Sequence, residues 1–365
     1  MIQISKYQIA VMTVLFQIGS TPLFALGSQA KQDSWLTMLA AASVGLVLLF
    51  MYLFIQSRAP DHDLIGLLRI CFGKLFGSFM GGCFIIYFAY ESMRNLRDFG
   101  EITTVTLLSQ TPQFVIMLIV ILLALYAIAM GIETFCRVVE ILTPIVICSY
   151  TILVILILSS KLISFDRIRP VLENGIVPVL KAAFPDIVSF PFGQMVIFLM
   201  MWHLLHDKQR VKRFSIVAYI SVALFLTMMN MMDVMVLGPT LIGNSTLPFL
   251  QTVQLIQVGE VLERLDVLVT LLLFLGLFVK MTAFYWAASF ALSRLMGWES
   301  KLPIFAVGTV IFITSFLEPD YTYHVWLGLK VSVKLFPIFQ VLIPLMMFIA
   351  ILIRKIPVQP APKEV

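Results

Sequence analysis

The sequence predicts an all-α membrane protein of about ten transmembrane helices in two halves of five. Of its 365 residues, 60% are hydrophobic and 12% charged, whereas soluble domains carry about twice that share of charge. Ten apolar stretches approach or exceed the roughly 20 residues that cross a hydrocarbon core. Gly and Pro interrupt the first and sixth stretches at equivalent places, which indicates two related halves.

The expected spans follow one another along the whole chain. They lie near residues 8–29, 34–56, 78–108, 113–131, 138–160, 181–203, 213–237, 266–293, 303–317 and 331–353. The first is too long for a cleaved signal sequence and lacks a small-residue cleavage site. We therefore expect one polytopic domain over 1–365, with a first repeat over about 8–160, a second over about 181–353 and a short cytoplasmic tail over 354–365.

The Lys and Arg residues indicate the orientation, because cytoplasmic loops carry an excess of them. With the N-terminus inside, 14 of the 25 fall in cytoplasmic segments and 8 in external ones, while Arg94, Arg97 and Lys280 fall within spans. An even number of spans then places both termini in the cytoplasm. The net charge of +5 is therefore a topology signal. Nucleic-acid binding is not expected, since 207–213 is the one dense basic run.

Two spans contain residues that interrupt a helix: Gly19, Ser20, Thr21 and Pro22 in the first, and Phe190, Pro191, Phe192 and Gly193 in the sixth. Pro removes a backbone donor, and Gly permits non-helical dihedrals. Unwound backbone survives in a bilayer only where it is buried in protein or lines a cavity. Phe190 follows Gly19 by 171 residues, close to half of the chain. Ordinary proline kinks are an alternative, but two matching breaks favour a binding site between inverted repeats.

The third span carries a strip of ionisable residues: Glu91, Arg94, Arg97, Asp98 and Glu101. At about 100° per residue they share an arc of about 120°, with Tyr87 and Tyr90 on the same side. Charges at this depth are costly and mark an interior or water-lined face. The i,i+4 spacings Arg94–Asp98 and Arg97–Glu101 would permit pairing within the helix. A structural ion-pair strip and a role in ligand coupling or gating are equally supported.

Lys280 lies in the middle of the eighth span, with no acidic residue within two turns of its own helix. The cytoplasmic end, at Arg294, is too far away for the side chain to reach. Its partner must come from another helix or from carbonyl groups, unless the amine is neutral. We therefore expect an interior role in coupling or gating, for example an ammonium in place of a sodium ion.

The remaining signals are weaker. Four Cys form no CxxC pair, His203 and His206 lack a third ligand, and neither a phosphate loop nor a catalytic set is present. We therefore expect no catalysis, no metal and no cofactor. The external stretch 238–265 contains Gly-Pro and Leu-Pro breaks and then an amphipathic run. An external lid, a partner-docking helix and an interfacial connector all fit it.

Several motifs resemble one known family. They are Pro170–Pro178 running into Phe190–Gly193, then Leu237–Pro239, Ser245–Phe249, Gly259–Asp266, Phe278–Lys280 and Gly328–Lys330. Together with the layout of the spans, they resemble the B-subunit family of spore germinant receptors. These are endospore germination permeases of the amino acid–polyamine–organocation superfamily. The resemblance covers essentially the whole chain and is most specific in the second half.

The resemblance implies a LeuT-like fold with broken helices 1 and 6, in the inner membrane of a spore. It also implies recognition of a small nutrient germinant, usually an amino acid, beside an A subunit and a lipoprotein C subunit. By position, the ligand would lie at the two breaks with Gln194, Tyr87 and Tyr90. Gln194 departs from the family pattern, because relatives often carry Glu there.

Three functions follow from these expectations. The first is a sensor that binds a nutrient and shifts between conformations felt by partner subunits. The second is an amino-acid secondary transporter coupled to H⁺ or Na⁺ through Lys280 or the strip Glu91–Glu101. The third is a path for water or ions along the charged face of the third span.

Overall fold

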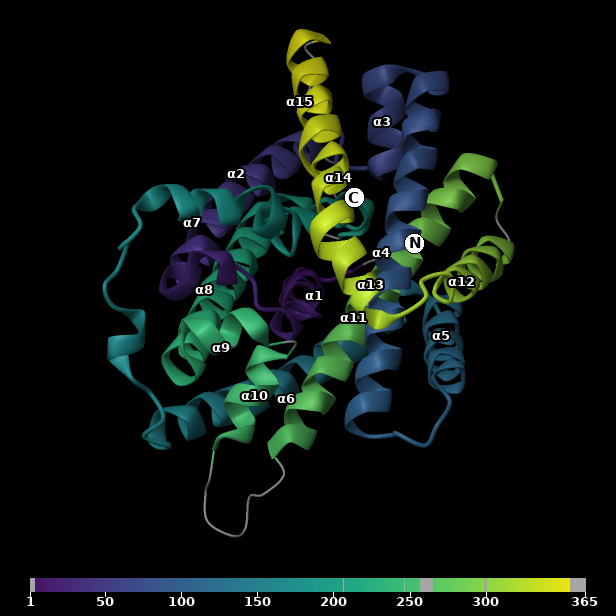
Figure 1. Ribbon diagram of the computed structural model, residues 1–365. Coiled ribbons are helices and arrows are strands. Elements are labelled where there is room, and N and C mark those ends of the chain that lie inside the picture. The colour runs from purple at the N-terminus through teal and green to yellow at the C-terminus, as the bar shows by residue number, and fades with distance from the viewer. Residues whose placement is uncertain (1–3, 206, 246, 257–264, 299–300, 355–365) are drawn as a thin grey trace.

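The computed structural model describes residues 4–205, 207–245, 247–256, 265–298 and 301–354, which form a bundle of helices (Figure 1). Within these ranges, β-pairing is confined to one bridge between Ile4 and Leu205. Six helical segments are long and apolar enough to cross a membrane: Ser28–Arg58, Ile132–Ser159, Ile176–Met200, Val211–Leu237, Leu265–Met296 and Tyr321–Arg354. The all-helical class and the multi-pass membrane character are therefore confirmed.

The first half opens with a short helix, α1 (Lys6–Ile18), which starts at a capping box between Ser5 and Gln8. Two 3₁₀ turns follow it, Thr21–Leu23 and Ser28–Asp33. The other helices of this half are α2 (Ser34–Arg58), α3 (Leu64–Phe72), α4 (Lys74–Thr106), α5 (Gln113–Ala129) and α6 (Ile132–Ser159).

The second half contains a second interrupted helix. It begins as α7 (Ile176–Ala182), passes through a π turn at Ala183–Ile187, breaks at Phe190 and continues as a 3₁₀ helix, Phe192–Met200. The helices that follow are α8 (Val211–Leu237), α9 (Pro239–Asn244), α10 (Pro248–Gln254), α11 (Leu265–Met296), α12 (Leu302–Thr314), α13 (Tyr321–Trp326), α14 (Val333–Pro337) and α15 (Ile343–Arg354). π turns join the last three into one segment.

Several elements differ from the expected spans. The first span is shorter, because α1 ends where Gly19 leaves helical dihedrals. α4 is 33 residues long, but its strip of ionisable residues makes it too polar to stand among the six apolar segments. α5 and α12 are apolar but short. α3 was not expected; the Asp63 side chain caps its start by accepting the Gly66 N–H. In the stretch 238–265, residues 257–264 lie outside the described structure, and the rest forms α9 and α10.

The interior is organised around α1, α4 and α11. α4 and α11 share the most extensive helix–helix contact of the described residues, while α1 packs against α6, α8 and α11. α1 lies inside the bundle, and α5 and α12 lie together at its periphery (Figure 1). The first break is therefore surrounded by protein, as unwound backbone in a membrane requires.

The contact between the first break and α11 requires glycine at position 276. We expect Gly276→Ala to lower the free energy of unfolding by about 1–3 kcal/mol. The added Cβ would lie 2.7 Å from the Gly19 carbonyl oxygen and 3.0 Å from its Cα. Gly82→Ala in α4 is the matched control, since its Cβ meets nothing within 4 Å. Thermal unfolding in detergent measures both, and equal midpoints for the two variants would contradict this packing.

Candidate ligand-binding site

The first break is produced by the backbone of Gly19. Its φ of 27° and ψ of −116° end α1, although its N–H still donates to the Leu15 carbonyl at 2.9 Å. A positive φ is strained for any residue with a side chain. A Cβ here would also lie 2.7 Å from Cδ of Lys280. Glycine therefore both ends the helix and leaves room for the lysine.

The second break lies at Phe190 and Pro191, between a helical turn and the 3₁₀ helix. The Phe190 N–H still donates to the Asp186 carbonyl at 3.0 Å, and the Gln194 N–H donates to the Pro191 carbonyl at 3.2 Å. Gly193 is required by a close neighbour, because a Cβ there would overlap Oε1 of Gln340. The break is thus packed against the last helical segment.

Lys280 lies where the two breaks meet. Its side chain is completely buried, and Nζ lies 4.3 Å from the ring centroid of Phe190 and 5.5 Å from that of Phe16. Aromatic faces attract an ammonium, but Nζ has no hydrogen-bond partner among the described residues. Gly276 lies one helical turn earlier in α11 and packs on Gly19. The same face of α11 therefore contacts the first break and presents the amine.

Acceptor groups face this amine from α4 and the second break. Glu91 and Gln194 are buried, and the Gln194 side-chain amide donates to Oε2 of Glu91 at 2.8 Å. Glu91 and Lys280 are close enough to interact electrostatically. Oε1 of Glu91 and Oε1 of Gln194 have no partner in the described structure. An unpaired donor and two unpaired acceptors therefore lie in one buried region.

Further polar atoms around the breaks are buried without a hydrogen-bond partner among the described residues. They are both amide atoms of Gln17, Oγ of Ser189, Oγ1 of Thr282 and Oε1 of Gln340. Each such group costs about 1–3 kcal/mol when left unsatisfied, and native proteins contain few of them. A concentration of them is therefore typical of a site that holds a polar molecule.

Two cavities adjoin this region. The inner one has a volume of about 20 Å³, room for about one water, and is lined by Ser20, Phe24, Glu91, Arg94, Asn95, Asp98, Phe190, Gly328, Leu329, Val333 and Phe336. The outer one has a volume of about 570 Å³ and is also lined by Phe24 and Phe190. The rings of these two residues are 5.6 Å apart and nearly perpendicular. Leu329 and Val333 also line both cavities, so this aromatic pair forms part of the wall that the two cavities share.

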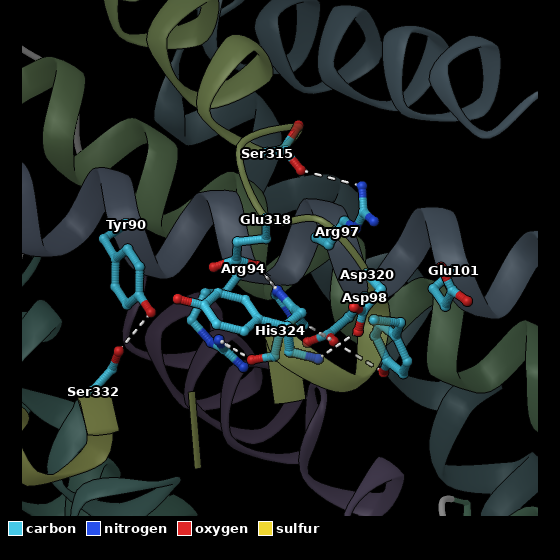
Figure 2. A network of polar contacts seen from close by, with 12 residues as sticks. Tyr90, Arg94, Arg97, Asp98, Glu101, Ser315, Glu318, Asp320, His324 and Ser332 are labelled. Carbon is cyan, nitrogen blue, oxygen red and sulfur yellow. Dashed lines mark hydrogen bonds and ion pairs between the residues drawn. The ribbon is translucent and has the colours of Figure 1, made fainter. Parts of the chain in front are cut away.

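Beyond the inner cavity, the charged strip of α4 is bonded to α13 (Figure 2). Asp98 accepts hydrogen bonds from the Tyr321 hydroxyl and from Nε2 of His324, both at 3.1 Å. The other ring nitrogen of His324, Nδ1, contacts Oε2 of Glu318. The Arg94 guanidinium donates to the His324 carbonyl at 2.9 Å. With a proton on each nitrogen, the ring donates to both carboxylates and connects α4 to α13.

The i,i+4 spacings that would permit pairing within α4 form no ion pair between side chains in the described structure. None of the ion pairs among the described residues joins Arg94 to Asp98 or Arg97 to Glu101. Arg97 donates to the Ser315 carbonyl at 3.3 Å, and Glu101 accepts from Gln113 at 3.1 Å. The physical reason is that α13, the turn after α12 and the start of α5 supply partners from outside the helix. Figure 2 shows Arg97 and Glu101 apart from the His324 group.

The other candidate residues separate into two sets. Gly19, Ser20, Phe190, Gln194, Glu91, Arg94, Asp98 and Lys280 are brought together at the breaks and the inner cavity. The rest have other neighbours. Phe192 packs on Tyr219, Tyr90 bonds to Ser332, and Thr21 and Pro22 line a small cavity beside α8. Tyr87 stacks on Phe339 but still adjoins the second break, because its hydroxyl accepts from Nε2 of Gln340 at 2.8 Å.

Sequence reasoning missed four residues of this region. His324, Glu318, Gln340 and Gly276 were not among the expected site residues. Gly276 stands four residues before Lys280, on the same helical face. Gln340 is the single polar residue between Lys334 and Arg354, and that is the signal that could have identified it.

Comparisons with known proteins agree on one family. A family model described as spore germination protein matches residues 3–322. Spore germination protein KB of Bacillus subtilis (strain 168) is 31% identical over 97% of this chain and 95% of its own length. Two further proteins of that organism are similar. Spore germination protein YndE is 24% identical over 78% of this chain and 77% of its own length. Spore germination protein B2 is 22% identical over 86% of each.

The contacts of His324 predict a large effect of single substitutions. We expect Asp98→Asn or His324→Gln to lower the free energy of unfolding by about 3 kcal/mol, because each leaves a buried charge without its partner. Glu133→Gln is the control, since its ion pair with Arg137 is exposed and should matter by less than about 0.5 kcal/mol. Thermal unfolding in detergent checks this. In the double variant Asp98→Asn/His324→Gln, the loss of unfolding free energy should be smaller than the sum of the two single-variant losses. A loss equal to that sum would refute the interaction.

Proposed function

Because this chain belongs to the spore germination permease family, we propose that it is the membrane subunit of a spore germinant receptor. It binds a small nutrient, an amino acid, at the two breaks and triggers germination through an A subunit and a lipoprotein C subunit. The proposal places the chain in the inner membrane of the spore with both termini in the cytoplasm. It also takes the bundle as a ten-helix, LeuT-like fold of two inverted five-helix repeats.

One observation carries the choice of ligand: the unpaired ammonium of Lys280 beside Gly19 and Phe190, with unpaired acceptors of Glu91 and Gln194 near it. An amino acid has a carboxylate that can bind the ammonium of Lys280 and an ammonium that can donate to the acceptors of Glu91 and Gln194. The two charged ends of the ligand would thereby satisfy groups that are otherwise buried without partners. That gain in hydrogen bonding favours a zwitterion over an apolar molecule.

The cavities support entry from the larger one. The outer cavity has room for an amino acid, whereas the inner one has room for about one water. A ligand that passes from the outer cavity to Lys280 would have to move Phe190, whose ring lies 4.3 Å from Nζ and packs on Phe24. Because Phe190 belongs to the second break, binding would change the packing of that helix. A ligand that contacts one arrangement better than the other shifts the population between them, and partner subunits would respond to that shift.

The proposal predicts that Lys280 is required for binding. We expect at least one amino acid to raise the unfolding midpoint of the purified chain by mass action. Lys280→Met should weaken that ligand at least tenfold, because its carboxylate would lose the ammonium. Lys74→Met at the exposed start of α4 is the control and should bind like the parent protein. A screen of the twenty amino acids by thermal shift tests this. No stabilising amino acid, or equal binding by Lys280→Met, would contradict the proposal.

A second candidate is an amino-acid transporter coupled to H⁺ or Na⁺. The buried pair of Lys280 and Glu91 favours it, since opposite ionisable groups beside a binding site can exchange a proton. A transporter carries the amino acid across the membrane, whereas a receptor only binds it. We expect purified protein in liposomes to bind the amino acid found by thermal shift without accumulating it under an imposed pH or sodium gradient. Concentrative uptake that is lost in Lys280→Met would instead establish transport.

A further inference from the structure

A groove of about 480 Å³ lies between the end of α2 and the start of α8, and it shares no lining residue with either cavity of the candidate site. Its wall changes character along its length. One part is apolar and is formed by Phe50, Leu53 and Phe54 of α2. The other part is polar or basic and includes Ser57, Lys208 and Lys212.

The groove lies where the apolar parts of α2 and α8 give way to their charged ends. α2 and α8 pack against each other, and both belong to the six segments that are long and apolar enough to cross a membrane. α2 ends at Arg58 and α8 begins at Val211, so charged residues follow the apolar ones at this end of both helices. Phe50 and Ser57 are seven residues apart, about 10 Å along the helix. The basic end therefore lies at headgroup depth and the aromatic end at acyl-chain depth.

The basic end contains positively charged groups that are free to bind a further anion. Lys212 is exposed and has neither a hydrogen bond nor an ion pair with another described residue. Lys208 forms an ion pair with Asp61, and its ammonium has further donors. At the end of α2, the Arg58 guanidinium lies over the ring of Phe54, a residue of the groove wall, at 4.6 Å, and its Nε has no partner in the described structure. Lys208 and Lys212 of the dense basic run 207–213, which the candidate site does not use, thus line one end of the groove.

The wall also contains an unpaired buried donor. Trp202 lines the groove and is 1% exposed, and its Nε1 has no hydrogen-bond partner among the described residues. An indole N–H is a donor only. Leaving it unsatisfied costs about 1–3 kcal/mol. An oxygen acceptor of a bound molecule that reaches this N–H would satisfy it.

We propose that this groove is a binding site for an anionic phospholipid. The phosphate lies at Lys208 and Lys212, an ester or phosphate oxygen accepts from Trp202, and an acyl chain follows Phe54 and Phe50. Basic pockets between membrane helices on the cytoplasmic side bind anionic headgroups in this manner. A free phosphate would leave the aromatic wall unused, and a zwitterionic lipid would gain less from the two lysines. The occupant is therefore a lipid, and its headgroup is negative.

Native mass spectrometry of the delipidated protein tests the site. We expect phosphatidylglycerol to bind at least tenfold more tightly than phosphatidylcholine. Lys208→Gln/Lys212→Gln should remove that preference, because attraction to an anionic headgroup depends on each basic residue near it. Lys74→Gln/Arg137→Gln removes two exposed charges elsewhere and should retain the preference. Trp202→Phe should weaken both lipids severalfold. Unfolding midpoints in phosphatidylcholine confirm that each variant is folded.

The overturning results are equally specific. Equal affinity of the parent protein for the two lipids would refute the site. So would unchanged preference in Lys208→Gln/Lys212→Gln, or an equal loss in Lys74→Gln/Arg137→Gln. Glycerol 3-phosphate carries the headgroup chemistry without an acyl chain. We expect it to compete at least a hundredfold less well than phosphatidylglycerol, and equal competition would show a small-anion site in place of a lipid site.

Discussion

Unwound backbone inside a membrane must be covered by protein, and the contact between Gly19 and Gly276 provides that cover here. α1 ends at Gly19, and α11 approaches it closely at Gly276 because neither glycine has a side chain. Lys280, one turn further along α11, then lies directly against the break. Phe16 before the first break and Phe190 at the second face its ammonium. One close backbone contact thus positions an amine, two helix breaks and the groups around them.

The charged strip of α4 must likewise be satisfied by groups of the protein. Ionisable side chains in a membrane interior need partners, and the i,i+4 spacing offers them within the helix. The structure supplies most of them from outside it instead. Asp98 bonds to His324 and Tyr321, Arg94 to the His324 carbonyl, and Arg97 to the Ser315 carbonyl. Gly328 permits this arrangement, because a Cβ there would overlap the Arg94 guanidinium. α4 is consequently held to the segment that begins the last span.

These two sets of contacts share α4, which connects the site at the breaks to the start of the last helical segment. Glu91 of α4 faces Lys280 and Gln194, while Asp98, two turns later, belongs to the His324 group. The inner cavity is lined by residues of both sets. Under the proposed function, a ligand at the breaks would therefore change the surroundings of α4, and α4 contacts the segment leading into the last span. The groove between α2 and α8 lies outside this pathway and concerns the surrounding lipid.

The sequence by itself determined the membrane class, the positions of most helices and the two breaks, because apolar length and the backbone chemistry of Gly and Pro act locally. It also placed Glu91, Asp98 and Lys280 at membrane depth. Only the tertiary structure decided their partners. Phe190 faces Lys280 whereas Phe192 packs on Tyr219, and His324 joins a residue 226 positions earlier in the chain. Such choices depend on how distant helices pack, and hydropathy and local spacing carry no information about that.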